Sequence, residues 1–306
     1  MTTAPDLDFA PYGIDTLWLD RAPKPRTILI AYPHPDDESF GNGGTIARYV
    51  AEGAAVHYAC ATRGECGTVD AHMLEGYADT AALRTAEQTC AARALGLAAV
   101  HFLGHRDSGM PGTADNQHPN AFIQAPLERV AGQLAALIRA LRPQVVLTFN
   151  SYGGYGHPDH IACYHATQAA FEAAADPARF PEAGPAWAVS KLYEINRPRE
   201  LTRQAWERMR ERGMKTPLDN PDYQLENFTA PDELITTAID VAEFMGLKRA
   251  ALLEHRTQIA ADGPFLSMPE DIGRSWSGVE YFTLLRARVA LPPHDGYEDD
   301  LFAGIG

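Results

Sequence analysis

The sequence predicts an α/β fold: a mostly parallel sheet covered by helices on both faces, with a smaller C-terminal elaboration. Two observations lead to this prediction. Short apolar runs that contain β-branched residues alternate with segments of helical periodicity as far as residue 175. Polar and charged residues follow directly after several of these runs, which is typical of loops at the carboxyl ends of parallel strands. Because right-handed helical crossovers join consecutive parallel strands, the helices should lie on both faces of the sheet.

The segment up to residue 103 contains the first expected strands and helices. Strands are expected at residues 27–33, 55–62 and 98–103, and helices at residues 45–51 and 80–95. Gly53 and Gly96 follow the two helices, at the position where a left-handed backbone often ends a helix. Residues 1–25 lack periodicity, so we expect them to lie as an arm over the domain.

A further helix and strand complete the expected core. Residues 127–141 repeat apolar residues at helical spacing, and Pro143 follows as a stop signal before an apolar run at residues 145–149. We therefore assign residues 1–175 to a Rossmann-like α/β catalytic core. Residues 176–306 are expected to complete the sheet and shape the substrate pocket, within one continuous domain.

The C-terminal elaboration begins with a proline-rich connector at residues 176–185. We expect a strand at residues 190–195, helices at residues 200–212 and 240–258, and a loose acidic tail at residues 292–300. Residues 216–231 form a polar loop with three prolines, long enough to serve as a lid or a wall of the substrate pocket.

Composition limits the class of function. The 306 residues have a net charge of -14, which disfavours nucleic acids and anionic membranes as partners because both are themselves negatively charged. No apolar stretch approaches the length of a membrane span, and the N-terminus has no basic signal-peptide region, so we expect a cytoplasmic enzyme with a small-molecule substrate. The four cysteines form no C-x-x-C pair and are expected to be free thiols, with Cys60 and Cys90 buried.

The first chemically distinctive motif is His34-Pro-Asp-Asp37, directly after the first expected strand. Pro33 and Pro35 stop ladder hydrogen bonding, so the cluster should lie in the loop that leaves the strand. Imidazole and carboxylate ligands together suit Zn²⁺ or Fe²⁺. The alternative is a turn in which an aspartate caps the following helix.

The second motif, Tyr155-Gly-His-Pro-Asp-His160, follows the run at residues 145–149. Pro158 suits the first position of a helix, so His157 and His160 should project near one helix N-terminus. Since both motifs follow strands of one sheet, we expect the two loops to meet and hold a single metal ion.

The paired motifs resemble the LmbE / PIG-L family of zinc-dependent N-acetylglucosaminyl de-N-acetylases, and within it the deacetylases and amidases of the mycothiol and bacillithiol pathways. The resemblance is specific over residues 27–175 and fainter beyond. Its further stretches are Thr62-Arg-Gly-Glu65, Arg84-x-x-Glu87, Arg106-Asp-Ser-Gly-Met110 and a trace from Lys248 to Gln258.

The resemblance implies a role for each matching position. His34, Asp37 and His160 would be the zinc ligands, with Fe²⁺ as a possible replacement for zinc. Asp36 would be the general base, and His157 and Tyr155 would act at the oxyanion. Arg84 and Asp107 would bind the sugar.

Chemical reasoning agrees with this division of roles. Hydrolysis of an acetamide needs a hydroxide at neutral pH, a site for the oxyanion and a proton for the departing amine. Zinc lowers the pKa of a bound water from about 15.7 to about 7. Asp36 is next to a ligand and His157 is one turn from another, so both can face the same carbonyl group. Asp159 could orient His157 from behind.

Several alternatives remain open. Without the family resemblance, Arg84 would be interpreted as a structural residue that pairs with Glu87 on a helix, and Asp107 as a turn residue. Two histidines and a carboxylate also fit non-haem Fe(II) oxygenases, although those usually have all-β barrels. A nucleotide-binding protein is disfavoured because Ile46 breaks the glycine fingerprint after Gly44. Glu38, Glu65 and His255 have no assigned role.

We therefore expect a zinc-dependent amidohydrolase that removes the N-acetyl group from an N-acetylglucosaminyl conjugate. The conjugate could be a thiol-cofactor precursor, such as the malate or inositol glycoside, or a chitooligosaccharide. The alternative within the family is an amidase of mycothiol or bacillithiol S-conjugates. The sequence does not determine the oligomeric state, and a homo-oligomer is compatible with it.

Overall fold

The computed structural model describes residues 7–259, 268–293 and 295–306, and in these residues eight strands form one sheet. The order across the sheet is β1-β4-β3-β2-β5-β6-β8-β7. The strands are β1 (Asp15–Trp18), β2 (Thr27–Tyr32), β3 (Ala55–Cys60), β4 (Ala99–Phe102), β5 (Val145–Thr148), β6 (Lys191–Asn196), β7 (Thr237–Asp240) and β8 (Val279–Ala287). The five central strands, β4, β3, β2, β5 and β6, run parallel to one another. Antiparallel pairing occurs at the two edges, through β1 on one side and through β8 and β7 on the other. The predicted mostly parallel α/β fold is confirmed.

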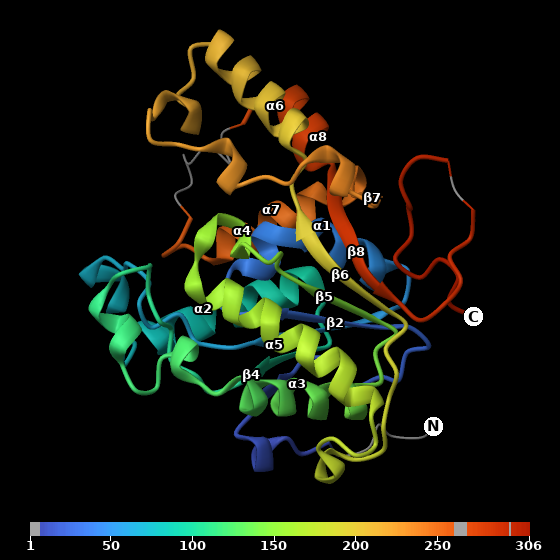
Figure 1. Ribbon diagram of the computed structural model, residues 1–306. Helices are drawn as coiled ribbons and strands as arrows, with labels where there is room; N and C mark the ends of the chain where they lie inside the picture. The colour runs from blue at the N-terminus through green and yellow to red at the C-terminus, as the bar shows by residue number, and fades with distance from the viewer. Residues whose placement is uncertain (1–6, 260–267, 294) are drawn as a thin grey trace.

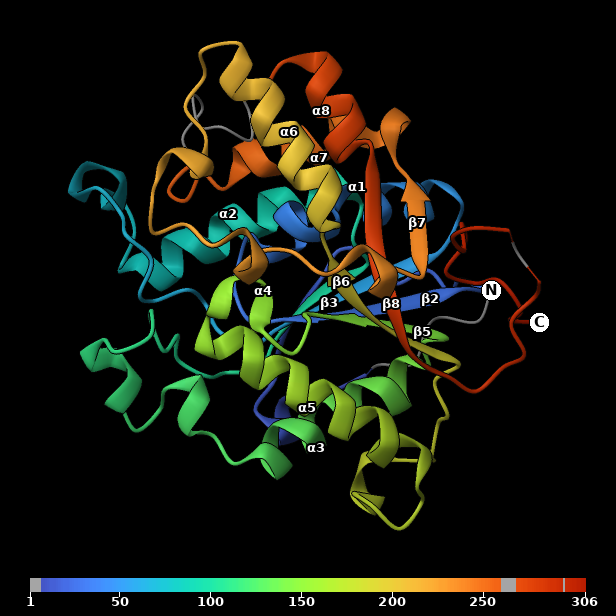
Figure 2. The same cartoon turned by 45° about the horizontal axis from the view of Figure 1, so that its top comes forward.

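Helices cover both faces of the sheet, as Figures 1 and 2 show: α1, α2 and α7 lie on one side, and α3 and α5 lie on the other. The helices are α1 (Asp37–Ala51), α2 (Thr80–Leu95), α3 (Leu127–Leu141), α4 (Gly153–Gly156), α5 (Pro158–Ala175), α6 (Arg199–Glu211), α7 (Met245–Glu254) and α8 (Glu270–Ser277). Alternate side chains of β2 contribute to the two cores. Ile28 and Ile30 pack towards α1 and α2, whereas Leu29 and Ala31 pack towards α3 and α5.

The helix after the first motif begins earlier than predicted. We expected it at residue 45, but α1 begins at Asp37 and contains a kink at Asn42, whose φ of -139° is not helical. Glu280 compensates for the kink because its carboxylate accepts hydrogen bonds from the amides of Gly44 (3.0 Å) and Thr45 (2.7 Å). A distant strand therefore caps the second part of α1, which sequence periodicity does not reveal.

The described parts of both terminal segments pack against the sheet. The N-terminal arm contains β1, which pairs with β4 at one edge of the sheet. The expected loose tail is wrong, because Glu298 is buried and accepts hydrogen bonds from Lys191 Nζ (2.5 Å) and the Tyr193 hydroxyl (2.6 Å). Leu301 is also fully buried. Strand β8 and helix α8 were not expected from the sequence, and α7 begins at Met245 rather than at residue 240.

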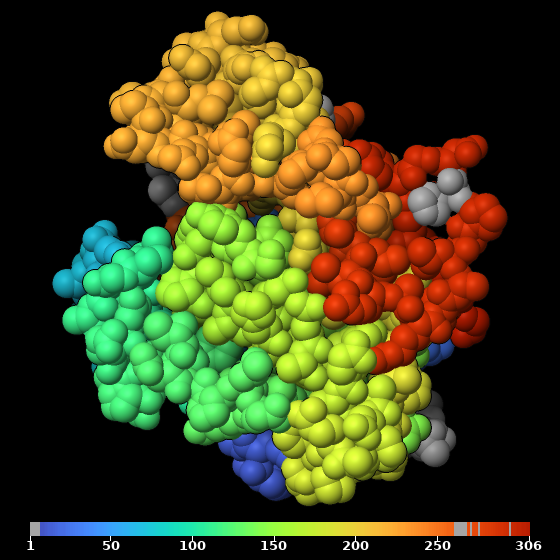
Figure 3. All heavy atoms as spheres, in the orientation of Figure 1, coloured from blue at the N-terminus to red at the C-terminus, as the bar shows by residue number. Residues whose placement is uncertain are grey.

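Helices α6 and α8 form a separate, smaller hydrophobic cluster outside the two cores that flank the sheet. Trp206 and Trp276 lie in its centre, with ring centroids 5.1 Å apart. In the space-filling view of Figure 3, α6 and the segment after it, coloured gold to orange, stand out from the body as a lobe. No helix in the described part of the chain is both long and apolar enough to cross a membrane.

The four cysteines are free thiols, as predicted. Cys60 is buried in β3, but Cys90 is exposed, contrary to the prediction. Cys90 lies on α2, whose small alanines made the whole helix resemble a buried one.

Candidate active site

The site lies at the point where the strand order of the sheet reverses, between β2 and β5. Strand β2 pairs with β3 on one side and with β5 on the other, so the loops after β2 and β5 leave the sheet as neighbours. This is the position at which open α/β sheets bind ligands. His34 follows β2, and His160 lies in the first turn of α5 after β5. The two rings come within 3.2 Å, so the predicted meeting of the two loops is confirmed.

Three donor groups converge at this point. His34 Nδ1 lies 3.2 Å from His160 Nε2 and 3.4 Å from Asp37 Oδ2, and His160 Nε2 lies 3.4 Å from Asp37 Oδ1. Donors at about 2.0–2.1 Å from a tetrahedral zinc ion lie about 3.3 Å from one another. The spacing and chemistry of these buried groups therefore fit one such ion.

The surroundings favour the ligand forms of two of these groups. Burial lowers the pKa of His160 to about 3, so its ring is neutral at neutral pH. Burial opposes ionisation of Asp37, but His160 and His34 outweigh it and lower the pKa of the Asp37 carboxyl below its ordinary value. A neutral imidazole and an ionised carboxylate are the forms that bind metal.

Two carboxylates lie behind His34, on the side away from His160. Asp159 Oδ2 is 3.1 Å from His34 Nε2, and Asp107 Oδ1 is 3.5 Å from the same atom. The amide of Ser108 donates to Asp159 Oδ2 at 3.0 Å. This arrangement fixes the ring of His34, as carboxylates commonly do for metal-binding histidines. The sequence suggested that the Asp159 carboxylate contacts His157. In the structure it contacts His34 instead.

In the described part of the chain, two further sets of side chains have candidate ligand atoms that all lie within 4.8 Å of one another: His34 with His157 and His160, and His34 with Asp107 and Asp159. Both contain His34. The site is therefore one cluster centred on that residue, and not two independent ones.

Asp36, next to Asp37, has an unusual backbone conformation. Its φ is 109°, a region that non-glycine residues avoid and that costs on the order of 1–3 kcal/mol. Its carboxylate oxygen Oδ2 lies 3.1 Å from Nη2 of Arg84. Burial raises the pKa of Asp36 to about 6, although Arg84 opposes this shift. A carboxylate that titrates near neutrality is suited to take a proton and release it again.

His157 and Tyr155 border the other side of the site. The backbone amide of Asp159 donates to His157 Nδ1 at 3.2 Å, so we assign the ring proton to Nε2. Burial lowers the pKa of His157 to about 4, so at neutral pH the ring is a neutral donor. Burial also raises the pKa of Tyr155, so its hydroxyl stays protonated at neutral pH. The ring of Tyr155 lies 5.1 Å from that of His160.

The two predicted sugar-binding residues lie in the same site but contact protein groups. Arg84 is 3% exposed, and its Nη atoms donate to the carbonyls of Gly64 and Pro35 and to Asp36. Asp107 is also buried, and the amides of Gly109 and Cys66 donate to its carboxylate. Burial opposes ionisation of Asp107, but hydrogen bonding to His34 holds its pKa well below the ordinary value.

Two further parts of the site involve the loop at residues 216–231, suggested by the sequence as a lid or pocket wall, and two residues to which the sequence assigned no role. Phe228, in the loop at residues 216–231, stacks on Tyr155 with the rings 11° from parallel, so this loop borders the site. Glu38 and His255 form a fully buried pair with Oε1 and Nε2 3.0 Å apart. Glu38 lies in the first motif and His255 in the fainter family trace, but neither signal predicts that the two residues pair. Nothing in the sequence singles out Phe228 within its loop.

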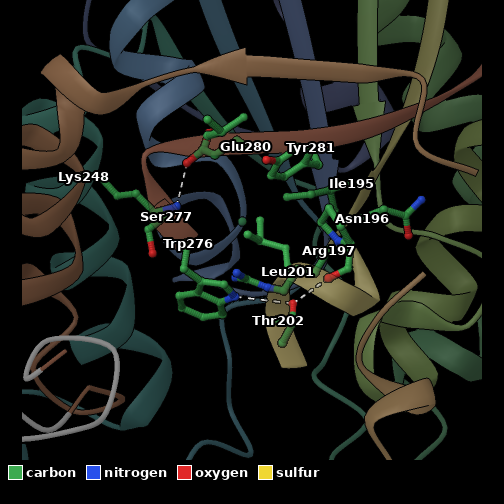
Figure 4. Close-up of a pocket in the computed structure, with 13 residues that line it drawn as sticks. Ile195, Asn196, Arg197, Leu201, Thr202, Lys248, Trp276, Ser277, Glu280 and Tyr281 are labelled. Carbon is green, nitrogen blue, oxygen red and sulfur yellow. Dashed lines mark hydrogen bonds and ion pairs between the residues drawn. The ribbon is translucent and has the colours of Figure 1, made fainter. Parts of the chain in front are cut away.

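A separate small pocket, shown in Figure 4, is lined by residues of α1, β6, α6, α7, α8 and β8. Gly41, Arg197 and Trp276 are among the residues that line it. The charged groups at its edge already have partners, since Lys248 Nζ lies 2.6 Å from Glu280 Oε1. It contains none of the residues that converge on His34.

Comparison with known proteins gives a consistent result. Residues 29–171 match the family model PIG-L, described as GlcNAc-PI de-N-acetylase. A 1D-myo-inositol 2-acetamido-2-deoxy-α-D-glucopyranoside deacetylase of Geodermatophilus obscurus is 42% identical over 290 residues, which are 92% of this chain and 98% of that protein.

Solved structures share the fold at lower identity. The N,N'-diacetylchitobiose deacetylase of Pyrococcus horikoshii has a TM-score of 0.59 and 22% identity, covering 85% of this chain and 84% of its own. The 4-carboxy-2-hydroxymuconate hydratase GalB of Pseudomonas putida has a TM-score of 0.53 and 21% identity, covering 88% of this chain and 100% of its own. Because a deacetylase and a hydratase share this fold, the fold alone does not select the reaction.

Proposed function

The chain belongs to the PIG-L family of GlcNAc-PI de-N-acetylases, and from this premise we propose that it is a zinc-dependent deacetylase of the N-acetylglucosaminyl conjugate of myo-inositol. Full-length similarity to deacetylases named for that substrate supports the inositol conjugate. The bacillithiol precursor, with malate as the aglycone, finds no support among these relatives.

One observation is central to the proposal: the spacing of 3.2–3.4 Å among donor atoms of His34, Asp37 and His160. In the proposal these three residues hold the metal ion. A bound zinc ion supplies a Lewis acid and a nucleophile that is available at neutral pH. Asp107 and Asp159 keep the ring of His34 in its orientation through Nε2.

Asp36 is the general base of the proposed reaction. It takes a proton from the attacking water and later delivers that proton to the amine that leaves. Its pKa of about 6 suits both steps near neutral pH. Arg84 holds the Asp36 carboxylate through Nη2 and thereby fixes the direction of proton transfer.

His157 and Tyr155 stabilise the negative charge that develops on the amide oxygen. The Nε2–H of His157 and the hydroxyl of Tyr155 are neutral donors, and neither needs to become charged for this role. One well-placed donor of this kind contributes about 2.7–4 kcal/mol to transition-state stabilisation. The sugar would lie beside Tyr155 and Phe228, where Arg84 and Asp107 remain candidates for contacts with its hydroxyl groups.

The test is a substrate screen with the zinc-loaded enzyme. The substrates are the inositol and malate glycosides of N-acetylglucosamine, diacetylchitobiose and a mycothiol S-conjugate, and the readouts are free amine and free acetate. We expect the inositol glycoside to give the highest kcat/KM. Release of neither product from any of the substrates would refute the proposed reaction, and preference for the S-conjugate would favour the amidase alternative.

A further inference from the structure

The backbone of Asp36 requires a restraint that its own sequence does not provide. Its φ of 109° lies in the region that favours glycine, and its carbonyl accepts the amides of Ser39 and Phe40 at 3.0 Å. The conformation thus starts α1 and at the same time aims the Asp36 side chain towards Arg84. A residue held in such a conformation relaxes unless surrounding groups fix it.

Glu38 supplies a direct contact to this strained peptide. Its Oε2 accepts a hydrogen bond from the amide nitrogen of Asp36 at 3.2 Å. Its Oε1 accepts one from the Ser39 hydroxyl at 2.6 Å and lies 3.0 Å from His255 Nε2. Glu38 and His255 are both 0% exposed, so solvent does not compete for these bonds. The carboxylate of Glu38 is therefore held in one orientation.

His255 directly follows α7, and this helix holds α1 at a second point. Lys248, earlier in α7, pairs with Glu280, whose carboxylate binds the amides of Gly44 and Thr45 beyond the kink of α1. Figure 4 shows the Lys248–Glu280 pair beside the pocket. Groups that α7 holds thus contact α1 both in its first turn and beyond its kink.

We propose that Glu38 and His255 are positioning residues for the general base: they fix the peptide of Asp36 so that its carboxylate faces the metal site. The proposal rests on the proposed function, in which Asp36 is that base. Glu38 acts through one hydrogen bond to the Asp36 amide, and His255 acts by holding Glu38. Neither residue contacts the substrate or the metal ligand set.

A purely structural role is the competing explanation. Buried ion pairs contribute little net stability on average, because loss of hydration offsets their attraction. The same C-terminal segment offers a matched control in Thr257, which binds Glu87 of α2 through its amide (2.9 Å) and hydroxyl (2.7 Å). Thr257→Val removes the two hydrogen bonds of this hydroxyl, the one donated to Glu87 and the one accepted from Gln258 Nε2, and leaves the contact to Asp36 in place.

The experiment compares Glu38→Gln with Glu38→Met. Glutamine keeps an oxygen acceptor for the Asp36 amide, whereas methionine has a similar shape and no such acceptor. We expect Glu38→Met to lower kcat about 100-fold and Glu38→Gln to stay within about 10-fold of wild type. KM and zinc content should be unchanged in both variants. His255→Phe, which keeps the Glu38 acceptor but removes its holder, should lower kcat about 10-fold.

Crystal structures provide a readout that does not depend on turnover. We expect Asp36 to leave the positive-φ region in Glu38→Met and to keep it in Glu38→Gln and Thr257→Val. Wild-type kcat in Glu38→Met, or an equal loss of kcat in Thr257→Val at a matched melting temperature, would overturn the proposal. If Glu38→Met does not fold, a wild-type kcat in His255→Phe would overturn the proposal.

The two proposals can fail separately. If the wild-type enzyme hydrolyses none of the amides, the proposed function is refuted, and the conformation of Asp36 in the variant crystals still decides the positioning role. If the wild type is active and the Asp36 backbone is unchanged in Glu38→Met, only the positioning role is refuted.

Discussion

Arg84 Nη2 lies 3.1 Å from Oδ2 of Asp36 and 2.5 Å from the carbonyl oxygen of Pro35, so one guanidinium nitrogen contacts the Asp36 carboxylate and the peptide before it. Lysine cannot reproduce the full set of contacts, because its one ammonium nitrogen would replace both Nη1, which donates to Gly64, and Nη2. We expect Arg84→Lys to lower kcat about 100-fold with KM within about 2-fold of wild type. Steady-state kinetics with saturating zinc would measure both constants.

The control for this prediction is Arg48→Lys, since Arg48 pairs with Glu52 on the outer part of α1. It should leave both constants unchanged. A large rise in KM with constant kcat in Arg84→Lys would instead indicate that the guanidinium binds the sugar directly.

Replacement of Asp36 and of His160 should separate turnover from metal binding. Asp36→Ala should retain zinc and lose nearly all turnover, because the donors of the three proposed ligands remain in place. His160→Ala should lose zinc affinity, since it removes one of three ligands. Metal analysis after dialysis, together with amine release, would check this. Zinc loss in Asp36→Ala with normal turnover after reloading would reverse the two assignments.

His157 should affect the transition state more than the binding of substrate. We expect His157→Ala to lower kcat by about 10²–10³, the usual effect of losing one oxyanion donor. His165→Ala is the matched control, because His165 is an exposed histidine of the same helix. It should behave as wild type. Equal losses of kcat in both variants would point to a general disturbance of α5.

A buried histidine pair away from the site predicts loss of stability in acid. His57 Nδ1 lies 3.2 Å from His101 Nε2, and burial lowers the pKa of His57 to about 4. Between pH 6.5 and 4 the unfolded chain binds a proton that the folded chain does not, so the free energy of unfolding falls as pH falls. From pH 7 to pH 5, His57 should account for a loss of about 2 kcal/mol.

Urea unfolding of His57→Gln at the two pH values would test this, because glutamine retains a polar group and does not titrate. We expect a smaller loss of stability between pH 7 and pH 5 than in the wild type. The same loss in both proteins would assign the acid sensitivity to other groups.

Two glycines of different surroundings predict opposite effects on stability. A Cβ at Gly44 would lie 2.6 Å from Val241 Cγ2, so Gly44→Ala should destabilise the fold by about 1–3 kcal/mol. A Cβ at Gly246 in α7 would meet nothing within 4 Å, so Gly246→Ala should stabilise it by up to about 1 kcal/mol. Thermal unfolding would measure both changes. Stabilisation by Gly44→Ala would contradict the close packing of α1 against Val241.

The convergence of His34 and His160 was predictable because each follows a buried apolar run, and carboxyl ends of parallel strands share one edge. The start of α1 was not, since its glycines disfavour a helix and its stabilising contacts come from the distant residues His255 and Glu280. The packed tail depends on Glu298 and Lys191, which are 107 residues apart. Sequence adjacency likewise suggested the wrong neighbour for the Asp159 carboxylate, because the direction of α5 turns it towards His34.

The attachment of Glu38 to His255 has a consequence for protein engineering. Substrate preference could be exchanged between relatives by recombining their N- and C-terminal halves, since Phe228 borders the site from the second half. A breakpoint between residues 176 and 227 would bring in a foreign His255 together with the foreign Phe228. Such chimeras would have to conserve the match between both halves at this buried pair, or they would bind the new substrate without converting it.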